Sequence, residues 1–125
     1  MPPLFLVMIG GAVGAGFRYH IGRVALAQLG PGFPWGTWLV NLLGGFLMGV
    51  LAGTLARISE GGESLRLFLG VGVLGGFTTF SAFSLETFNM LSRGEWTIAI
   101  AYAVSSVAGS ILTLILGVMM VRMVA

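Results

Sequence analysis

Hydroxyl side chains recur at helical spacing within the most apolar parts of this sequence. One row has a residue at every fourth position and consists of Tyr102, Ser106 and Ser110. A second, shorter row consists of Ser81 and Ser84. Residues three or four apart lie on one face of an α-helix, so each row predicts a polar stripe. Such hydroxyls can line a polar conduit, or they can bond to carbonyls of their own helix.

Two further polar groups and a set of aromatic rings accompany these stripes. Asn41 is the one strongly polar side chain of the predicted second membrane helix. Glu86 is the one acid expected at membrane depth. Polar groups at membrane depth mark functional sites by default. Four phenylalanines surround the serine row, namely Phe77, Phe80, Phe83 and Phe88. A ring edge is partly positive and could stabilise an anion without the tight hold of a fixed cation, although such rings also pack against lipid or a core.

The composition identifies the chain as an integral membrane protein. Of 125 residues, 57% are hydrophobic and 8% are charged, with no lysine, aspartate or cysteine. A soluble domain carries about 25% charged residues, so a typical soluble enzyme is excluded. Nucleic-acid binding is excluded because the sequence offers no dense basic face. The sequence also has no HExxH motif, nucleophile–base pair or phosphate-binding loop, which argues against an enzyme.

Four uncharged runs predict four membrane-spanning helices in a single domain over residues 1–125. The runs are 1–17, 24–56, 67–85 and 96–121. A spanning helix needs about 20 apolar residues, so the second run is too long for one simple crossing. It contains the helix breakers of residues 30–34, which cannot continue a helix. We therefore expect helices over about 3–28, 35–57, 65–92 and 95–122.

The arginines give these helices little preferred orientation. One side of the membrane would receive Arg57, Arg66 and Arg122, and the other Arg23 and Arg93, with Arg18 near that end. Short cytoplasmic loops normally carry an excess of Lys and Arg. An even balance indicates either insertion in both orientations or simply a small protein with few charges.

Glycine accounts for 21 of the residues and predicts both close packing and a helix break. Three pairs have the GxxxG spacing that lets helices approach closely, and these are Gly10/Gly14, Gly45/Gly49 and Gly72/Gly76. Residues 70–81 combine four glycines with two threonines, which is a poor helical sequence. We expect the third helix to break here, where freed carbonyl groups could bind a hard cation.

Two sequence motifs resemble those of the Fluc (CrcB) family of fluoride channels. One is GGFTTFSAFS at residues 75–84, followed by Glu86, and the other is GTWLVNLLGGF at residues 36–46. The resemblance extends over essentially the whole chain. Ala82 and Gly45 depart from it, because the family commonly has Thr and Ser there.

The resemblance implies a passive fluoride channel of the inner (plasma) membrane, built as an inverted, dual-topology homodimer with two pores. It implies that the pores are lined by Asn41, Phe80, Phe83, Tyr102, Ser106 and Ser110, to which we add Ser81 and Ser84 on their spacing. It further implies a structural sodium ion at the dimer centre, held by main-chain carbonyls of Gly75 and Thr78. Arg18 would lie at an aqueous vestibule.

Three other functions compete with this interpretation. Proton-coupled four-helix drug exporters also insert in both orientations, but they depend on an acid in the first helix, and residues 1–17 contain none. A fluoride/proton antiporter would use Glu86 as its proton-coupling group, whereas in a channel Glu86 would be a pore-end acid. A structural protein that packs through its glycines is the third alternative, but this function does not explain why the polar stripes are aligned.

Overall fold

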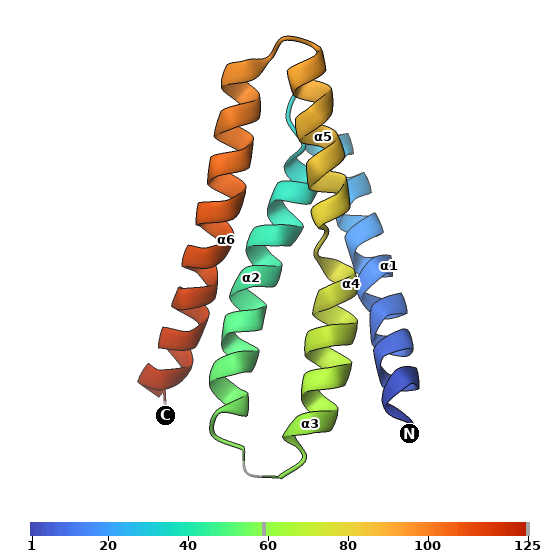
Figure 1. Ribbon diagram of the computed structural model, residues 1–125, viewed down its shortest axis with the longest axis vertical. Helices are drawn as coiled ribbons and strands as arrows, with labels where there is room; N and C mark the ends of the chain where they lie inside the picture. The colour runs from blue at the N-terminus through green and yellow to red at the C-terminus, as the bar shows by residue number, and fades with distance from the viewer. Residues whose placement is uncertain (59, 125) are drawn as a thin grey trace.

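The computed structural model describes residues 1–58 and 60–124, and the elements in these ranges are all helical (Figure 1). Four helices are long and apolar enough to cross a membrane. They are α1 (Pro3–Leu29), α2 (Trp35–Leu55), a segmented third helix (Gly62–Ser92) and α6 (Trp96–Val124). The prediction of an all-helical chain with four membrane-length helices is therefore confirmed.

Glycines in the left-handed region separate the helices. Gly30, Gly61 and Gly94 have φ angles of 80°, 77° and 79°, which L side chains rarely adopt. The third helix begins at Gly62 rather than near residue 65. Gly61 supplies the turn before it, and Glu63 lies in its first turn, where the helix dipole favours an acid.

The third helix consists of four segments with a break near its middle. The segments are α3 (Gly62–Leu65), the π-helical η1 (Arg66–Leu74), α4 (Gly75–Phe77) and α5 (Phe80–Ser92). Between α4 and α5, Thr78 and Thr79 are extended, with ψ angles of 160° and 122°. The Thr79 hydroxyl accepts a hydrogen bond from Ala82 N at 3.1 Å and so caps α5. The predicted break is confirmed, and it lies after the glycine-rich part, because Thr79 starts a new helix.

The glycines before the break remain helical and pack against α1. A Cβ added at Gly76 would lie 3.0 Å from Gly11 Cα. A Cβ added at Gly14 would overlap the carbonyl oxygen of Val73. The backbones of α1 and of the η1–α4 segment therefore approach as closely as small residues allow. At Gly49, α2 packs against α6 in the same way.

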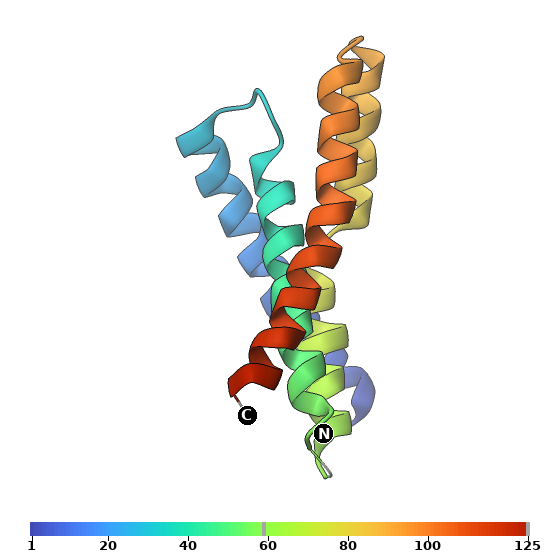
Figure 2. The same ribbon diagram turned by 90° about the vertical axis from the view of Figure 1, so that its left-hand side faces the viewer.

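The helices separate into two arms at one end of the molecule. The connections at residues 30–34 and 93–95 lie at this end, and both termini lie toward the other (Figure 1). One arm consists of the C-terminal part of α1 and the start of α2, and the other of α5 and the start of α6 (Figure 2). The second arm contains a buried cluster of Phe83, Met90, Ala99 and Tyr102. Many large apolar side chains on the outer surface are exposed, as expected for helices that face lipid.

Candidate functional site

A groove of about 420 Å³ lies beside the helix break and is bordered by α2, α5 and α6. It brings together seven of the residues predicted for the pore and the cation site, which are Asn41, Gly75, Thr78, Phe80, Phe83, Ser106 and Ser110. None of the residues that line the groove is charged. The groove therefore has a largely apolar wall with a few hydrogen-bonding groups.

Ser106 places a free hydroxyl in this wall. The residue is 4% exposed, and its Oγ has no hydrogen-bond partner among the described residues. Buried polar atoms almost always have a partner, so an unpaired one calls for an explanation such as a water or an ion. A hydroxyl in this position can donate a hydrogen bond to a small anion.

Phe80 and Phe83 of the motif are buried to different extents. Phe83 is 9% exposed and packs on the ring of Tyr102, with 5.2 Å between the ring centroids. Phe80 is 75% exposed in the single subunit, and its ring centroid lies 5.5 Å from that of Phe83. The pair thus extends from the core of the second arm to the open side of the groove.

Side chains from two other helices hold the backbone at the break. Asn41 of α2 makes two hydrogen bonds with the Thr79 backbone, and Arg18 of α1 donates from Nε to Gly76 O at 3.1 Å. The hydroxyl and the amide of Thr78 both donate to Leu74 O, at 2.9 and 3.0 Å. Polar backbone at membrane depth is tolerated only when the protein satisfies it in this way.

Two carbonyl groups at the break remain available. Within the described part of the chain, no hydrogen-bond donor meets the carbonyl oxygens of Gly75 and Thr78. Neutral carbonyl oxygens are ligands that hard cations accept. Gly75 is also exposed on the groove side, where a second molecule could contribute ligands. The residues present therefore fit a small cation held by main-chain oxygens.

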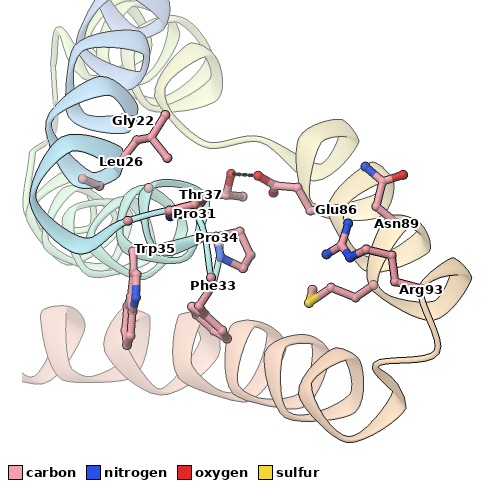
Figure 3. A pocket seen from close by; sticks show the side chains of 15 residues that line it. Gly22, Leu26, Pro31, Phe33, Pro34, Trp35, Thr37, Glu86, Asn89 and Arg93 are labelled. Carbon is pink, nitrogen blue, oxygen red and sulfur yellow. Dashed lines mark hydrogen bonds between the residues drawn. The ribbon is translucent and has the colours of Figure 1, made fainter.

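Tyr102 departs from its stripe, because its hydroxyl binds Glu86 instead of facing the groove. Tyr102 Oη donates to Glu86 Oε1 at 3.0 Å, and Thr37 Oγ1 donates to Glu86 Oε2 at 3.1 Å. Figure 3 shows Thr37 and Glu86 joined by this hydrogen bond at a second cavity, of about 300 Å³, between the two arms. Asn89 of α5 and Arg93, which directly follows α5, also line this cavity (Figure 3). Ser106 and Ser110 therefore line the groove, whereas the Tyr102 hydroxyl is bonded to Glu86, which lines the second cavity.

The serine row of α5 lies outside the groove. Ser84 Oγ donates to Phe80 O at 2.9 Å, and Ser81 Oγ lies 3.3 Å from Thr79 Oγ1. Both serines are exposed and satisfy their hydroxyls locally. The structure therefore does not bring Ser81 and Ser84 together with the other predicted pore residues in one subunit.

Arg18 lies at the edge of a third cavity, of about 250 Å³. Tyr19, Arg23, Thr37 and Thr79 also line it, so two arginines border one space near the break. Arg23 Nη1 donates to Tyr19 Oη at 3.1 Å. This placement is compatible with the vestibule that was expected at Arg18.

Three residues whose hydrogen bonds hold the site together were not predicted from the sequence. Thr37 holds Glu86, Thr79 caps α5, and Ser105 accepts a hydrogen bond from Trp38 Nε1 at 3.0 Å. The cap had a local signal, because a threonine ahead of a new helical run is a common N-cap. The other two bonds join residues 49 and 67 positions apart, which no local pattern indicates.

The chain is similar over nearly its whole length to known proteins. A family model described as CrcB-like protein, Camphor Resistance (CrcB), matches residues 5–118. The chain is 59% identical over 121 residues to the fluoride-specific ion channel FluC of Novosphingobium aromaticivorans, covering 95% of each protein. It is 52% identical over 122 residues to FluC of Sphingopyxis alaskensis, covering 98% of this chain and 97% of that protein. With its four membrane-length helices, the chain is a multi-pass membrane protein, not an enzyme, and it belongs to the CrcB/FluC family of fluoride channels.

Proposed function

We propose that this chain forms a fluoride-selective channel that conducts passively and so lowers the cytoplasmic fluoride concentration. The observation that carries the proposal is an uncharged groove that is lined by Ser106, Phe80 and Phe83. The buried hydroxyl of Ser106 has no hydrogen-bond partner among the described residues. Fluoride is small and strongly hydrated, so a selective path must replace its water with hydrogen-bond donors and ring edges. The names of the relatives, fluoride-specific ion channels, support this choice of ion.

The absence of charge from the groove supports conduction rather than tight binding. Conduction requires an ion to bind strongly enough to enter and weakly enough to leave. Hydroxyl donors at Ser106 and Ser110 and the ring edges of the phenylalanines meet this requirement, whereas an arginine in the groove would retain the anion. The arginines that line a cavity near the break, Arg18 and Arg23, would instead attract anions to the pore entrance.

The active form would be an inverted homodimer in the lipid bilayer. One subunit leaves the groove open, with Phe80 three-quarters exposed and Gly75 uncovered. A second copy in the opposite orientation would cover this side and provide a second, equivalent pore. The even distribution of arginines between the two ends of the chain supports insertion in both orientations.

A structural sodium ion would complete the dimer centre. The carbonyl oxygens of Gly75 and Thr78 from both subunits would hold it. Four neutral oxygens suit a small hard cation, and they leave its positive charge uncancelled. When bound, the ion would link the two breaks and favour anions in the pores beside it.

Fluoride efflux from proteoliposomes that contain the purified chain tests the proposal. We expect efflux driven by the fluoride gradient alone, with chloride efflux far slower from matched vesicles. Comparable chloride and fluoride rates would contradict the selectivity. Fluoride accumulation driven by an imposed pH gradient would instead identify a proton-coupled antiporter that uses Glu86, and no ion flux would favour a structural role.

A further inference from the structure

Arg18 connects α1 to the helix break, 58 residues away along the chain. Its Nε donates to the carbonyl oxygen of Gly76 at 3.1 Å. The close approach of α1 and the η1–α4 segment makes this possible, because Gly76 lies against Gly11 and Gly14 lies against Val73. Arg18 follows Gly14 by about one helical turn, so its side chain arrives at the end of α4.

The Gly76 carbonyl needs such a partner because of the break. In a continuous helix it would accept a hydrogen bond from the amide of residue 80, but α5 begins anew at Phe80. An unsatisfied carbonyl at membrane depth is strongly unfavourable, and a cation at a helix C-terminus is favourable. The guanidinium of Arg18 provides both the donor and the charge.

Gly76 lies in the chain between the two free carbonyl groups of Gly75 and Thr78. The Arg18 bond fixes the peptide that joins Gly76 to Phe77, and therefore limits how the peptides on either side can rotate. We propose that Arg18 is a positioning residue for the sodium site, which it serves by holding Gly76 O so that the carbonyls of Gly75 and Thr78 stay directed at the cation. The inference rests on the proposed function, because it takes these two carbonyls as the sodium ligands.

Arg23 offers a matched control for the charge of Arg18. Both arginines are on α1 and line the same cavity of about 250 Å³. Among the described residues, the side chain of Arg23 contacts Tyr19. It donates a hydrogen bond to the Tyr19 hydroxyl and lies over the Tyr19 ring. If Arg18 acted only by attracting anions, Arg18→Met would change the sodium dependence of the unfolding temperature no more than Arg23→Met does.

Three substitutions at position 18 separate the hydrogen-bond donor of Arg18 from its positive charge. In Arg18→Gln, the amide nitrogen lies the same number of bonds from Cα as the arginine Nε, so the donor is kept and the charge is lost. In Arg18→Met, a methyl group takes that place, so both are lost. Arg18→Lys keeps the charge but has a carbon at this place and its nitrogen one bond beyond.

Sodium binding is measured on the purified dimer in detergent. The readout is the rise in its unfolding temperature when sodium replaces N-methylglucamine at a constant chloride concentration. A ligand that binds only the folded state stabilises it by RT ln(1 + [L]/Kd), so a lower affinity requires proportionally more ligand for the same stabilisation. We therefore expect Arg18→Met to need about tenfold more sodium than the parent for the same rise. Arg18→Gln should match the parent. Should Arg18→Met fail to yield a dimer, Arg18→Lys replaces it, with weaker sodium dependence than Arg18→Gln expected.

The results that overturn the inference are specific. An unchanged sodium dependence in Arg18→Met, a loss in Arg18→Gln as large as that in Arg18→Met, or a stronger dependence in Arg18→Lys than in Arg18→Gln would each do so. In parallel efflux assays, Arg18→Gln and Arg23→Gln should both slow fluoride flux, because both remove a charge near the pore entrance. A parent dimer without any sodium dependence would refute the sodium site itself, and a parent without fluoride efflux would refute the proposed channel, so the three failures are distinguishable.

Discussion

The side-chain amide of Asn41 pairs with both polar atoms of the Thr79 backbone. Asn41 Oδ1 accepts from Thr79 N at 2.8 Å, and Asn41 Nδ2 donates to Thr79 O at 3.0 Å. A side chain of α2 thereby supplies hydrogen bonds that the broken third helix cannot make for itself. Although Asn41 lines the groove, both ends of its amide are engaged by the break.

Asn41→Ala should weaken the fold as well as the transport. The substitution leaves a backbone N–H and C=O without partners, at about 1–3 kcal/mol for each group. We expect a clearly lower unfolding temperature in detergent and little fluoride efflux. Asn89→Ala, at an exposed position of α5, is the control for stability and should leave the unfolding temperature unchanged. Equal stability of the two variants would show that the Asn41 pairing contributes nothing.

Phe80→Leu should give a stable protein with slow fluoride flux. Phe80 is largely exposed in the subunit, so its loss removes little internal packing. A loss of about 1.4 kcal/mol of ion stabilisation at the highest barrier slows flux tenfold. Phe88→Leu, also exposed on α5 but not in the groove, is the matched control and should conduct normally. Normal flux in Phe80→Leu would reduce this ring to a packing element.

Phe83→Leu should combine slow flux with reduced stability. The ring of Phe83 is buried against that of Tyr102, so its truncation also disturbs the core of the second arm. We expect a destabilisation of about 1 kcal/mol, within the range for apolar swaps of similar volume. The measurement is chemical unfolding in detergent beside the efflux assay. Stability lower in Phe80→Leu than in Phe83→Leu would reverse the assignment of the two rings.

Thr37 and Tyr102 should be energetically coupled through Glu86. Each donates to a different oxygen of this carboxylate, so Thr37→Val and Tyr102→Phe each remove one of its two donors. Residues in one hydrogen-bond network typically show interaction energies of about 0.5–3 kcal/mol in a double-mutant cycle. Unfolding of both single variants and the double variant measures this energy. Thr54→Val combined with Tyr102→Phe is the control and should be additive, because the hydroxyl of Thr54 donates to Val50 O within its own helix.

The connection between α2 and α3 should be accessible from both sides of the membrane. The chain has no cysteine, so Glu60→Cys introduces a single reactive group at an exposed position. An inverted dimer places this residue on each face, and an impermeant thiol reagent applied to either side should modify about half of the protein. Complete modification from one side alone would contradict dual topology.

The sequence predicts the four helices well because each is long and apolar and the connections carry glycine and proline. It also predicts that the third helix breaks, since Thr78 and Thr79 follow a glycine-rich run. It places the break only within residues 70–81 and not specifically at Thr78 and Thr79, because the glycines that would weaken an isolated helix are held helical by the glycines of α1. Packing of one backbone on another outweighs the local preference.

The polar stripe on α6 shows both the strength and the limit of spacing as a guide. Ser106 and Ser110 share the groove as their spacing indicates, but the hydroxyl of Tyr102 extends to Glu86. Helical periodicity gives the direction of a Cα–Cβ bond, whereas a tyrosine hydroxyl lies several bonds beyond it. Long polar side chains are therefore placed by their partners, and short ones by the helix.

The π-helical geometry of η1 sets the rotational phase of everything that follows it in the third helix. A π-helix closes its hydrogen bonds one residue later than an α-helix, as in the bond from Gly75 N to Gly70 O. Loss of one residue from this segment would change the direction in which α4 and the break face about the helix axis. Gly75 and Thr78 would then change their direction relative to α2 and α6, although neither residue is replaced. The length of η1 is therefore as much a determinant of the proposed ion site as the residues that surround it.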